Sequence, residues 1–254
     1  MAVVLVERQS AHTTLVALNR PERRNALTIE LMTDLVAAVD QASNDDTQRV
    51  LILRGAGPAF CAGMDLNETA DGSKAHESGG MVAKTLLALS QTRLITIAAV
   101  HGAAVAGGAG IMSACDFVVA AEGTKFGYPE ARRGLVAANV MTFLRRQLRE
   151  RDVRELLFAS ELIDAARARE IGLVNRVVPA AELDQEVGKI VASVLQGAPG
   201  ALTNAKRLLE QLWSTSVEQD IETALSHHMQ ARESAEAKEG VTAFLEKRAP
   251  RWAE

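Results

Sequence analysis

The sequence TIAAVHGAAVAGGAGIMSACD, residues 96–116, is the centre around which we expect the rest of this chain to fold. Its apolar run at 97–100 is typical of a buried strand, and residues 94–115 carry no formal charge, which predicts that the whole segment is buried. Glycines at 102, 107, 108 and 110 let the backbone approach another group closely. A strand that enters a glycine-rich turn and then a helix points free N–H groups at one place. That arrangement suits an anion, or an oxygen that becomes anionic during a reaction.

Three other interpretations of this stretch compete with a reactive site. A transmembrane helix fits its length, but the clustered glycines together with Thr96, His101 and Ser113 argue against one. A dinucleotide-binding fingerprint needs a third glycine where Ser113 stands. A tightly packed core helix fits the stretch as well as a reactive site does, so the rest of the chain must separate the two.

The composition predicts an ordinary globular protein. The 254 residues are 48% hydrophobic and 24% charged, which fits one large domain or one domain with a helical appendage. The net charge of −4, the pI near 5.8 and the lack of a basic block with interleaved aromatics argue against a nucleic-acid partner. Cys61 and Cys115 are too few for a disulfide framework or a metal site, and we expect buried thiols. The N-terminus shows no signal-peptide pattern, so we expect no membrane attachment and a reducing, cytoplasmic setting.

Strand, turn and helix signals alternate through the first half of the chain. Residues 3–7 and 13–18 predict a hairpin, and Thr28 is a good N-cap for a helix that runs to about residue 42. The apolar run 50–53 predicts a buried strand that enters a second glycine-rich turn at 55–66. Residues 67–80 predict a polar, mobile loop, 81–89 a helix and 116–121 another strand. Three strand–turn–helix units of this kind indicate a layered α/β core.

The second half of the chain is predicted to be mainly helical, except for a strand at 173–178. No flexible linker separates the two halves. We therefore predict a core domain at 1–195 that carries the site and a helical region at 196–254 that covers the site or packs against a neighbouring subunit. The expected helices are 140–148, 153–158, 165–170, 181–195, 201–213, 217–229 and 234–247.

Two glycine-rich turns that each follow a strand, at 62–66 and 106–110, are what a two-donor oxyanion hole requires. Glu130 follows the next strand and is placed to act as a base facing the same point. The alternative for Glu130 is an exposed acid at the start of a helix after Pro129, where a carboxylate is favourable. We expect His101 to be a packed side chain. The pair at 227 and 228 is expected to be solvated or at an interface, because no third metal ligand stands at a suitable spacing.

Seven motifs, in order along nearly the whole chain, carry a resemblance to a known family. They are NRPERRNAL at 19–27, AFCAGMDL at 59–66, VHGAAVAGG at 100–108, ACD at 114–116, FGYPE at 126–130, AREIGLVNRVVP at 168–179 and AFLEKR at 243–248. As an ordered set they resemble the crotonase superfamily, also called the enoyl-CoA hydratase/isomerase family. The resemblance implies an α/β fold, a crotonase-like spiral of repeated ββα units with a C-terminal α-helical trimerisation region. It also implies an acyl-CoA thioester substrate, a homotrimer or dimer of trimers, no metal, and no cofactor apart from the coenzyme A that the substrate carries.

The resemblance also assigns roles to residues of this chain. The backbone N–H groups of Met64 and Gly107 become the two oxyanion donors, and Glu130 becomes the catalytic acid/base. A Cβ at 107 is expected to crowd the thioester oxygen, whereas the side chain at 64 can vary. The residues expected to bind substrate are Arg23, Arg24, Ala26, Ala62, Gly63, Asp65, Leu66, Gly108 and Ala138.

The chain departs from the family pattern where a first glutamate is expected. That position, three residues after Gly107, holds Gly110, and the usual glycine-rich turn after the second glutamate reads VAAN at 136–139. We expect an enoyl-CoA hydratase in which Glu130 acts on water first as base and then as acid, with its pKa raised by burial. The alternatives are a Δ3,Δ2-enoyl-CoA isomerase that uses Glu130 as its proton shuttle, and a non-catalytic acyl-CoA-binding protein. A serine or cysteine hydrolase is not supported, because the chain has no G-x-S-x-G motif.

Overall fold

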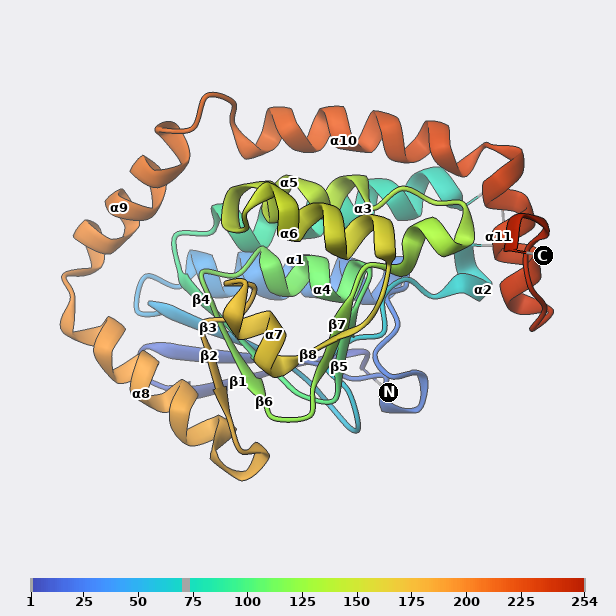
Figure 1. Cartoon of the computed structure of the whole chain (residues 1–254). Coiled ribbons are helices and arrows are strands. Elements are labelled where there is room, and N and C mark those ends of the chain that lie inside the picture. Colours follow the sequence, from blue (N-terminus) through green and yellow to red (C-terminus); the bar gives the residue numbers. More distant parts are fainter. Residues whose placement is uncertain (1, 70–73, 254) are drawn as a thin grey trace.

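The computed structural model describes residues 2–69 and 74–253 and is built on a six-stranded sheet (Figure 1). The strand order is β1-β2-β3-β4-β6-β9, with β1 and β2 antiparallel and every other neighbouring pair parallel. The strands are β1 (Val4–Ser10), β2 (Thr13–Leu18), β3 (Val50–Gly55), β4 (Ile95–Val100), β6 (Phe117–Ala121) and β9 (Arg176–Val178). The pairing of Val4 with Leu18 confirms the predicted hairpin.

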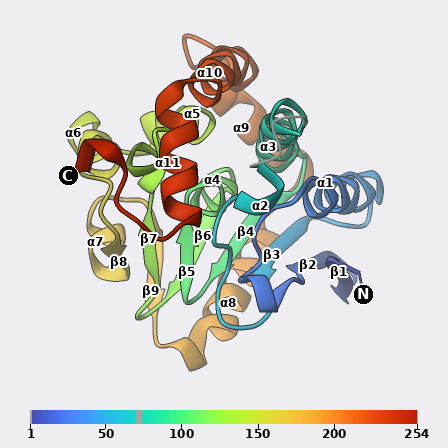
Figure 2. The same ribbon diagram turned by 90° about the vertical axis from the view of Figure 1, so that its right-hand side faces the viewer.

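A second, three-stranded sheet turns the chain into a spiral. It contains β5 (Ala103–Val105), β7 (Lys125–Gly127) and β8 (Ile163–Asp164), and it lies beside the large sheet in Figure 2. After β4 the chain bends at Gly102, where φ is +65° and a Cβ would overlap the carbonyl oxygen of Pro58. The chain then passes through β5 into helix α4 (Gly107–Ser113), and in the same way from β6 through β7 towards helix α5 (Ala138–Gln147). The predicted repetition of ββα units is confirmed.

Helices α1 (Ile29–Asn44) and α3 (Ala75–Gln91) pack side by side over one face of the large sheet. The Thr28 hydroxyl accepts a hydrogen bond from the Leu31 N–H at 3.2 Å, so the predicted N-cap is confirmed. Every third or fourth side chain of α1 faces the core, as amphipathic periodicity requires. The buried members are Leu31, Met32, Leu35, Val36, Ala38, Val39 and Ala42.

Helices occupy much of the stretch 67–80 that the sequence predicts to be a loop. Helix α2 (Leu66–Thr69) occupies its start, and α3 begins at Ala75, so the prediction is wrong on both sides of residues 70–73, which lie outside the described part. The physical reason is tertiary packing. A Cβ at Gly79 would lie 2.9 Å from Cε of Met229, so the small residue lets helix α10 (Val217–Arg232) lie close against α3. Gly79, which would disfavour an isolated helix, is tolerated here because it permits that contact.

The opposite face of the large sheet is covered by helix α8 (Leu183–Gln196). Leu183, Val187 and Ile190 of α8 pack against a second apolar cluster on that face. The sheet residues of this cluster are Val50, Ile52, Ile97, Ala99, Val119 and Ala121. Because both faces of the parallel strands are buried, the strands read as continuous apolar runs rather than as alternating ones.

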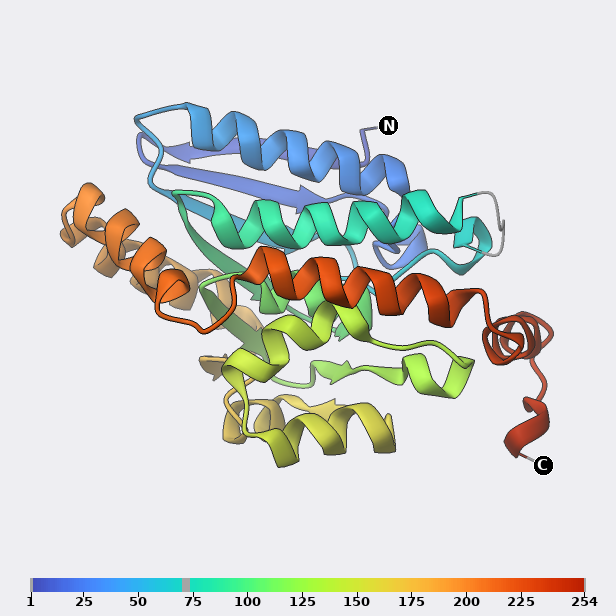
Figure 3. The ribbon, with the colours of Figure 1, turned by 90° about the horizontal axis from the view of Figure 1, so that it is seen from above.

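Of the C-terminal helices, the last two lie over the core of the same chain. Helix α9 (Pro199–Gln211) leads into α10 (Val217–Arg232), which packs on α3 and α5, and α11 (Ala235–Leu245) packs on the 3₁₀ turn Pro129–Arg133 (Figure 3). A capping box formed by Ser216 and Gln219 fixes the start of α10. The division into units at 195 and 196 falls at the end of α8 and stays a prediction.

The remaining helical segments connect these layers or follow α11. They are the 3₁₀ turns Pro21–Arg23, Ala180–Glu182 and Arg251–Ala253, helix α6 (Glu150–Arg154), the π-helical turn Glu155–Ala159 and helix α7 (Ala165–Glu170). The strand predicted at 173–178 begins only at Arg176, because the N–H groups of Leu173 and Val174 instead bond the Ala168 carbonyl at the end of α7. None of the helices within residues 2–69 and 74–253 is long and apolar enough to cross a membrane.

Candidate active site

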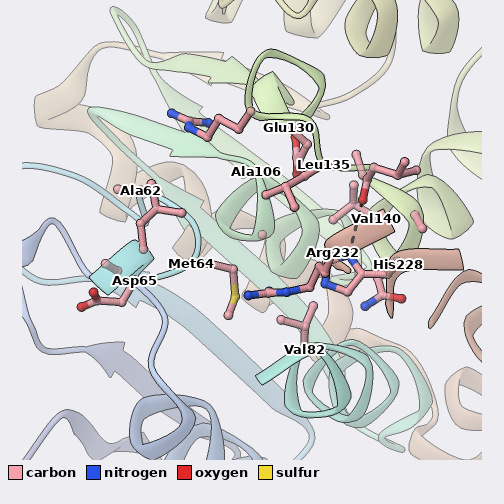
Figure 4. Close-up of a pocket in the computed structure, with 18 of the residues that line it drawn as sticks. Ala62, Met64, Asp65, Val82, Ala106, Glu130, Leu135, Val140, His228 and Arg232 are labelled. Atoms are coloured by element: carbon pink, nitrogen blue, oxygen red, sulfur yellow. Dashed lines mark hydrogen bonds between the residues drawn. The ribbon is translucent and has the colours of Figure 1, made fainter. Parts of the chain in front are cut away.

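One cavity of about 310 Å³ gathers most of the residues that the sequence singles out. It lies between the two glycine-rich turns, the 3₁₀ turn at Pro129–Arg133 and helices α3, α5 and α10 (Figure 4). Of the predicted site residues it is lined by Arg23, Ala26, Ala62, Met64, Asp65, Leu66, Gly107, Glu130 and Ala138. The fold therefore brings together residues from four separate motifs.

The backbone N–H groups of Met64 and Gly107 lie at this cavity. Gly107 is the first residue of α4, where N–H groups are left unbonded by the helix itself. Met64 and Leu27 form a short parallel bridge. In this bridge the Leu27 N–H donates to the Gly63 carbonyl and the Asp65 N–H donates to the Leu27 carbonyl, so the Met64 N–H points away from it. Neither the Met64 nor the Gly107 N–H donates a hydrogen bond within the part of the chain that the structure describes. Both N–H groups are therefore available for the oxyanion role that the sequence predicts, and that role stays a prediction.

Ala106, the residue directly before Gly107, has a strained backbone conformation. Its φ is +51° and its ψ is −126°, a region that residues with a Cβ rarely adopt. Such strain costs on the order of 1–3 kcal/mol and is concentrated at functional sites. The Ala106 N–H bonds the Gly127 carbonyl at 2.8 Å, so β7 holds the turn in place.

Three predicted binding residues do not line the cavity. Gly63 has a φ of +92°, and a Cβ there would lie 2.9 Å from the Val105 carbonyl oxygen. A Cβ at Gly108 would overlap the Cys61 carbonyl oxygen. Both glycines thus let the two turns approach each other. Arg24 is exposed, and its carbonyl accepts the Ala62 N–H at 3.0 Å. Contact of these three residues with substrate stays a prediction.

Asp65 is engaged in an ion pair that the sequence analysis did not foresee. Its Oδ2 lies 3.1 Å from Nη2 of Arg20, and both side chains are largely buried. The same guanidinium donates to the Ala26 carbonyl at 2.6 Å. Arg20 therefore fastens the loop at 20–26 to the first glycine-rich turn, and Asp65 shapes the site rather than offering it a free carboxylate. The sequence does single out Arg20, because this residue belongs to the motif NRPERRNAL at 19–27.

Glu130 is half-buried, and its Oε2 atom is buried without a hydrogen-bond partner among the described residues. It is the second residue of the 3₁₀ turn Pro129–Arg133. Burial raises the pKa of this carboxyl to about 7, while its own backbone N–H and the charge of Arg133 oppose the rise. An exposed acid at a helix start would show none of this. The pKa of the carboxyl instead lies near neutral pH, which suits a group that takes and returns a proton.

The space beside Gly110 is filled by an aliphatic side chain. A Cβ at 110 would overlap Cγ1 of Val140, and it would lie 3.8 Å from Cδ2 of Leu86. Val140 itself lines the cavity. The Val140 side chain thus fills the space into which a side chain at 110 would extend. Among the described residues that line the cavity, Glu130 is the one carboxylate outside the Arg20 ion pair.

Several polar residues of the cavity were missed from the sequence. Both amide atoms of Asn139 and the Nε2 of His228 are buried with no partner in the described part of the chain. Arg133 and Arg232 also line the cavity. His228 was expected to be solvated or at an interface; it is instead turned inward, with Nδ1 at 3.4 Å from the Val136 carbonyl (Figure 4).

The reason is that α10 reaches the site only by folding back over α3 and α5, which no local pattern reveals. His101, by contrast, packs through Nε2 on the Gly57 carbonyl at 2.8 Å and stays outside the cavity, as expected.

A spiral of ββα units with two unbonded N–H groups beside a buried carboxylate defines a protein of the crotonase fold. A family model described as enoyl-CoA hydratase/isomerase matches residues 8–254, and the chain belongs to that family. The family implies an acyl-CoA thioester as substrate.

Proteins similar to this chain match it over at least nine-tenths of their length. An enoyl-CoA hydratase of Mycobacterium tuberculosis is 35% identical over 97% of this chain and 94% of its own. A crotonyl-CoA hydratase of Syntrophomonas wolfei is 34% identical over 91% of this chain and 90% of its own. The crystal structure of an enoyl-CoA hydratase from Mycobacterium avium superposes with a TM-score of 0.88 at 34% identity, covering 99% of each chain.

Proposed function

We propose that this enzyme adds water to a 2-enoyl-CoA thioester. The N–H groups of Met64 and Gly107 hold the thioester oxygen. Glu130 takes a proton from water as the water oxygen bonds C3, and the electrons of the double bond move to give an enolate. Glu130 then returns the proton to C2, so that atoms and charge balance. The observation that carries the proposal is the buried carboxyl of raised pKa beside two unbonded N–H groups.

An isomerase would use the same groups differently, moving a proton from C2 to C4 of a 3-enoyl thioester. Asn139 favours hydration over that alternative. Its amide has one donor and one acceptor side, both buried and unpartnered in the same cavity as Glu130. A water molecule that must be held for attack needs such a partner, whereas proton transfer within one substrate does not.

Replacing Asn139 with alanine should therefore slow hydration about tenfold, which is the loss of one hydrogen bond worth about 1.4 kcal/mol. Isomerisation of a 3-enoyl thioester should change less than about twofold. The two rates are compared at saturating substrate, with the melting temperature as a control for folding. Equal loss in both reactions would remove Asn139 from the water site.

The pH dependence of hydration should report the carboxyl of Glu130. Because the ionised form must accept the water proton, kcat/KM is expected to fall as the pH drops through about 7 and to level off above it. Arg133→Met removes a positive charge that favours the ionised form, so it should move this limb to higher pH. A limb near the ordinary pKa of 4.5 would show that the carboxyl is solvated in the working enzyme.

The reaction itself tests the proposal. A 2-enoyl-CoA should lose its conjugated thioester absorbance on incubation with the enzyme. Gain of absorbance from a 3-enoyl-CoA alone would assign isomerisation. No change in absorbance with either class of thioester, together with measurable binding of a CoA ester, would favour the non-catalytic acyl-CoA-binding alternative.

Arg23 is the proposed contact for the phosphates of coenzyme A. It is exposed at the cavity, at the end of the 3₁₀ turn Pro21–Arg23. A cation at a solvated rim suits a phosphate, which keeps part of its hydration. We propose that no cofactor is needed beyond the coenzyme A of the substrate, because Glu130 and the two N–H groups supply both proton transfer and charge stabilisation.

We also propose that the chain assembles as a homotrimer or a dimer of trimers in the cytoplasm. An apolar strip at the end of α9 supports assembly, since large exposed apolar patches mark protein contacts. It consists of Leu208, Leu209, Leu212 and Trp213, all 47–75% exposed. Cys61 and Cys115 are free, buried thiols, in keeping with a reducing compartment. The mass of the assembly in solution distinguishes one trimer from two.

A further inference from the structure

Helix α11 lies directly on the turn that carries Glu130. A Cβ at Gly240 of this helix would overlap the carbonyl group of Arg133 and lie 2.8 Å from the Arg133 Cα. The turn approaches the helix in the same way, because a Cβ at Gly134 would overlap the carbonyl group of Glu236. Two glycines thus let the two backbones touch. Since glycine is disfavoured inside a helix, the residue at 240 is explained by this close approach rather than by helix formation.

The contact reaches Glu130 through the backbone of the turn. The Gly134 N–H donates to the carbonyls of Ala131 and Glu130, and the Leu135 N–H donates to the Glu130 carbonyl at 3.0 Å. Gly134 has a φ of +66°, the left-handed conformation that ends the turn. A displacement of α11 from this turn would therefore move the residue that carries the carboxyl.

A side chain of α11 continues the contact into the cavity. Phe244 lies one helical turn after Gly240 and lines the cavity. The guanidinium of Arg133 lies over its ring, 4.3 Å from the centroid. Arg133 is also the neighbour whose positive charge acts on Glu130. Helix α11 thus holds both the backbone and the charged group of Arg133, and it supplies part of the wall beside Glu130.

This contact contributes little hydrophobic stabilisation. The buried residues of α11 are Ala237, Gly240 and Ala243, which bury little apolar area. What the close approach provides is a fixed position, because backbones in direct contact cannot shift towards each other without overlap. The packing of α11 is therefore better suited to placing the turn than to stabilising the core.

We propose that α11 is a positioning element of the active site. Its contacts at Gly240 and Phe244 hold the turn Pro129–Arg133 so that the carboxyl of Glu130 faces the cavity and is shielded from bulk water. The proposal rests on the proposed function, in which Glu130 is the acid/base, and both α11 residues act through Glu130. A small displacement of the helix would misplace the carboxyl, and a misplacement of about 1 Å can cost up to about a hundredfold in rate.

Gly240→Ala tests the proposal, because the added methyl group overlaps the Arg133 carbonyl. The kcat for hydration of a 2-enoyl-CoA should fall at least about tenfold. The acid limb of kcat/KM should move from about 7 towards the ordinary pKa of 4.5, because water then reaches the carboxyl. The matched control is Gly188→Ala inside α8, where an added Cβ meets nothing within 4 Å, and it should change neither quantity. If Gly240→Ala does not fold, Phe244→Ala, which removes the ring from the same contact, replaces it in every comparison.

The pH limb is informative because Gly240→Ala changes no charge. The elements packed on the turn are α11 and the π-helical turn Glu155–Ala159. The titratable and charged groups of these elements, of the turn itself and of the cavity lining are Arg23, Asp65, Arg132, Arg133, Glu155, His228, Arg232, Glu236, Lys238 and Glu239. All of them remain in the variant, so a moved limb reports the surroundings of Glu130.

A melting experiment gives a second measurement that needs no turnover. At pH 8 the rise in melting temperature caused by Glu130→Gln reports how strongly the fold disfavours the ionised carboxyl. In the Gly240→Ala background this rise should shrink to less than half, because the carboxyl is then solvated. In the Gly188→Ala background the rise should be unchanged.

An unchanged pH limb, or an unchanged rise in melting temperature on Glu130→Gln, would overturn the proposal. Either result would show that α11 contributes packing alone, even where Gly240→Ala lowers kcat. If the unmodified enzyme hydrates no 2-enoyl-CoA, the proposed reaction fails. The melting comparison then still decides whether α11 shields Glu130, so the two failures are distinguishable.

Discussion

Glu130→Gln should reduce kcat for hydration by roughly 10²–10⁴-fold, the usual contribution of a positioned general acid–base. Glutamine matches glutamate in shape but can neither take a proton from water nor return one to C2. Binding of a saturated CoA thioester should change little, since the Met64 and Gly107 N–H groups remain. The measurement is the steady-state rate with a 2-enoyl-CoA, beside Glu122→Gln, an exposed glutamate outside the cavity, as a control.

The same substitution should stabilise the fold at alkaline pH, which separates lost chemistry from lost structure. The folded-state pKa of Glu130 is raised above its ordinary value of 4.5 to about 7. Below 4.5 both states are protonated and the carboxyl costs nothing. Between 4.5 and 7 the unfolded chain ionises first, so stability falls as the pH rises, reaching a penalty on the order of 3 kcal/mol above 7.

Glutamine stays neutral at every pH. Glu130→Gln should therefore melt several degrees above the parent at pH 8 and within about a degree of it at pH 4.5, given a shift of about 2–4 °C per kcal/mol for a chain of this size. A variant that keeps more than about a tenth of the hydration rate would contradict the assignment of Glu130 as the acid/base.

The sequence predicted the elements whose signals are local. The β1–β2 hairpin, the Thr28 cap and the strand that runs into Gly107 all follow from periodicity, capping chemistry and glycine placement. The two glycine-rich turns and Glu130, which the sequence predicts to face one point, do line one cavity, because the spiral brings them together. Their catalytic roles stay a prediction.

What could not be predicted depends on contacts between distant segments. Helix α3 extends through Gly79 only because α10 packs there, and His228 enters the cavity only because α10 folds back. The ion pair of Arg20 with Asp65 joins two motifs 45 positions apart. Arg232 likewise reaches the cavity only through α10, whereas Arg133 lines it from the turn Pro129–Arg133.

The Gly110 and Val140 pair explains how this chain departs from a two-glutamate site. A side chain at 110 needs room that Cγ1 of Val140 now occupies, so the two residues form one steric unit. Gly110→Glu alone should destabilise the protein by about 1–3 kcal/mol through overpacking, with the burial of a carboxylate adding to that cost. Val140→Ala removes the overlapping methyl groups and leaves the Val140 Cβ position 3.4 Å from a Cβ at 110, an ordinary contact.

The combined variant Gly110→Glu/Val140→Ala should therefore be more stable than the sum of its parts, with a coupling energy of at least about 1 kcal/mol. It should also hydrate a 2-enoyl-CoA at least about tenfold faster than Gly110→Glu, because a second carboxylate can then reach the water that Glu130 activates. Urea unfolding and initial rates on all three variants give both quantities, and the Gly110→Ala and Gly110→Ala/Val140→Ala pair isolates the steric part without a charge. If the changes in the free energy of unfolding are additive in both double-mutant cycles, the Val140 side chain moves aside at no cost. The absence of the first glutamate would then have no cause in packing.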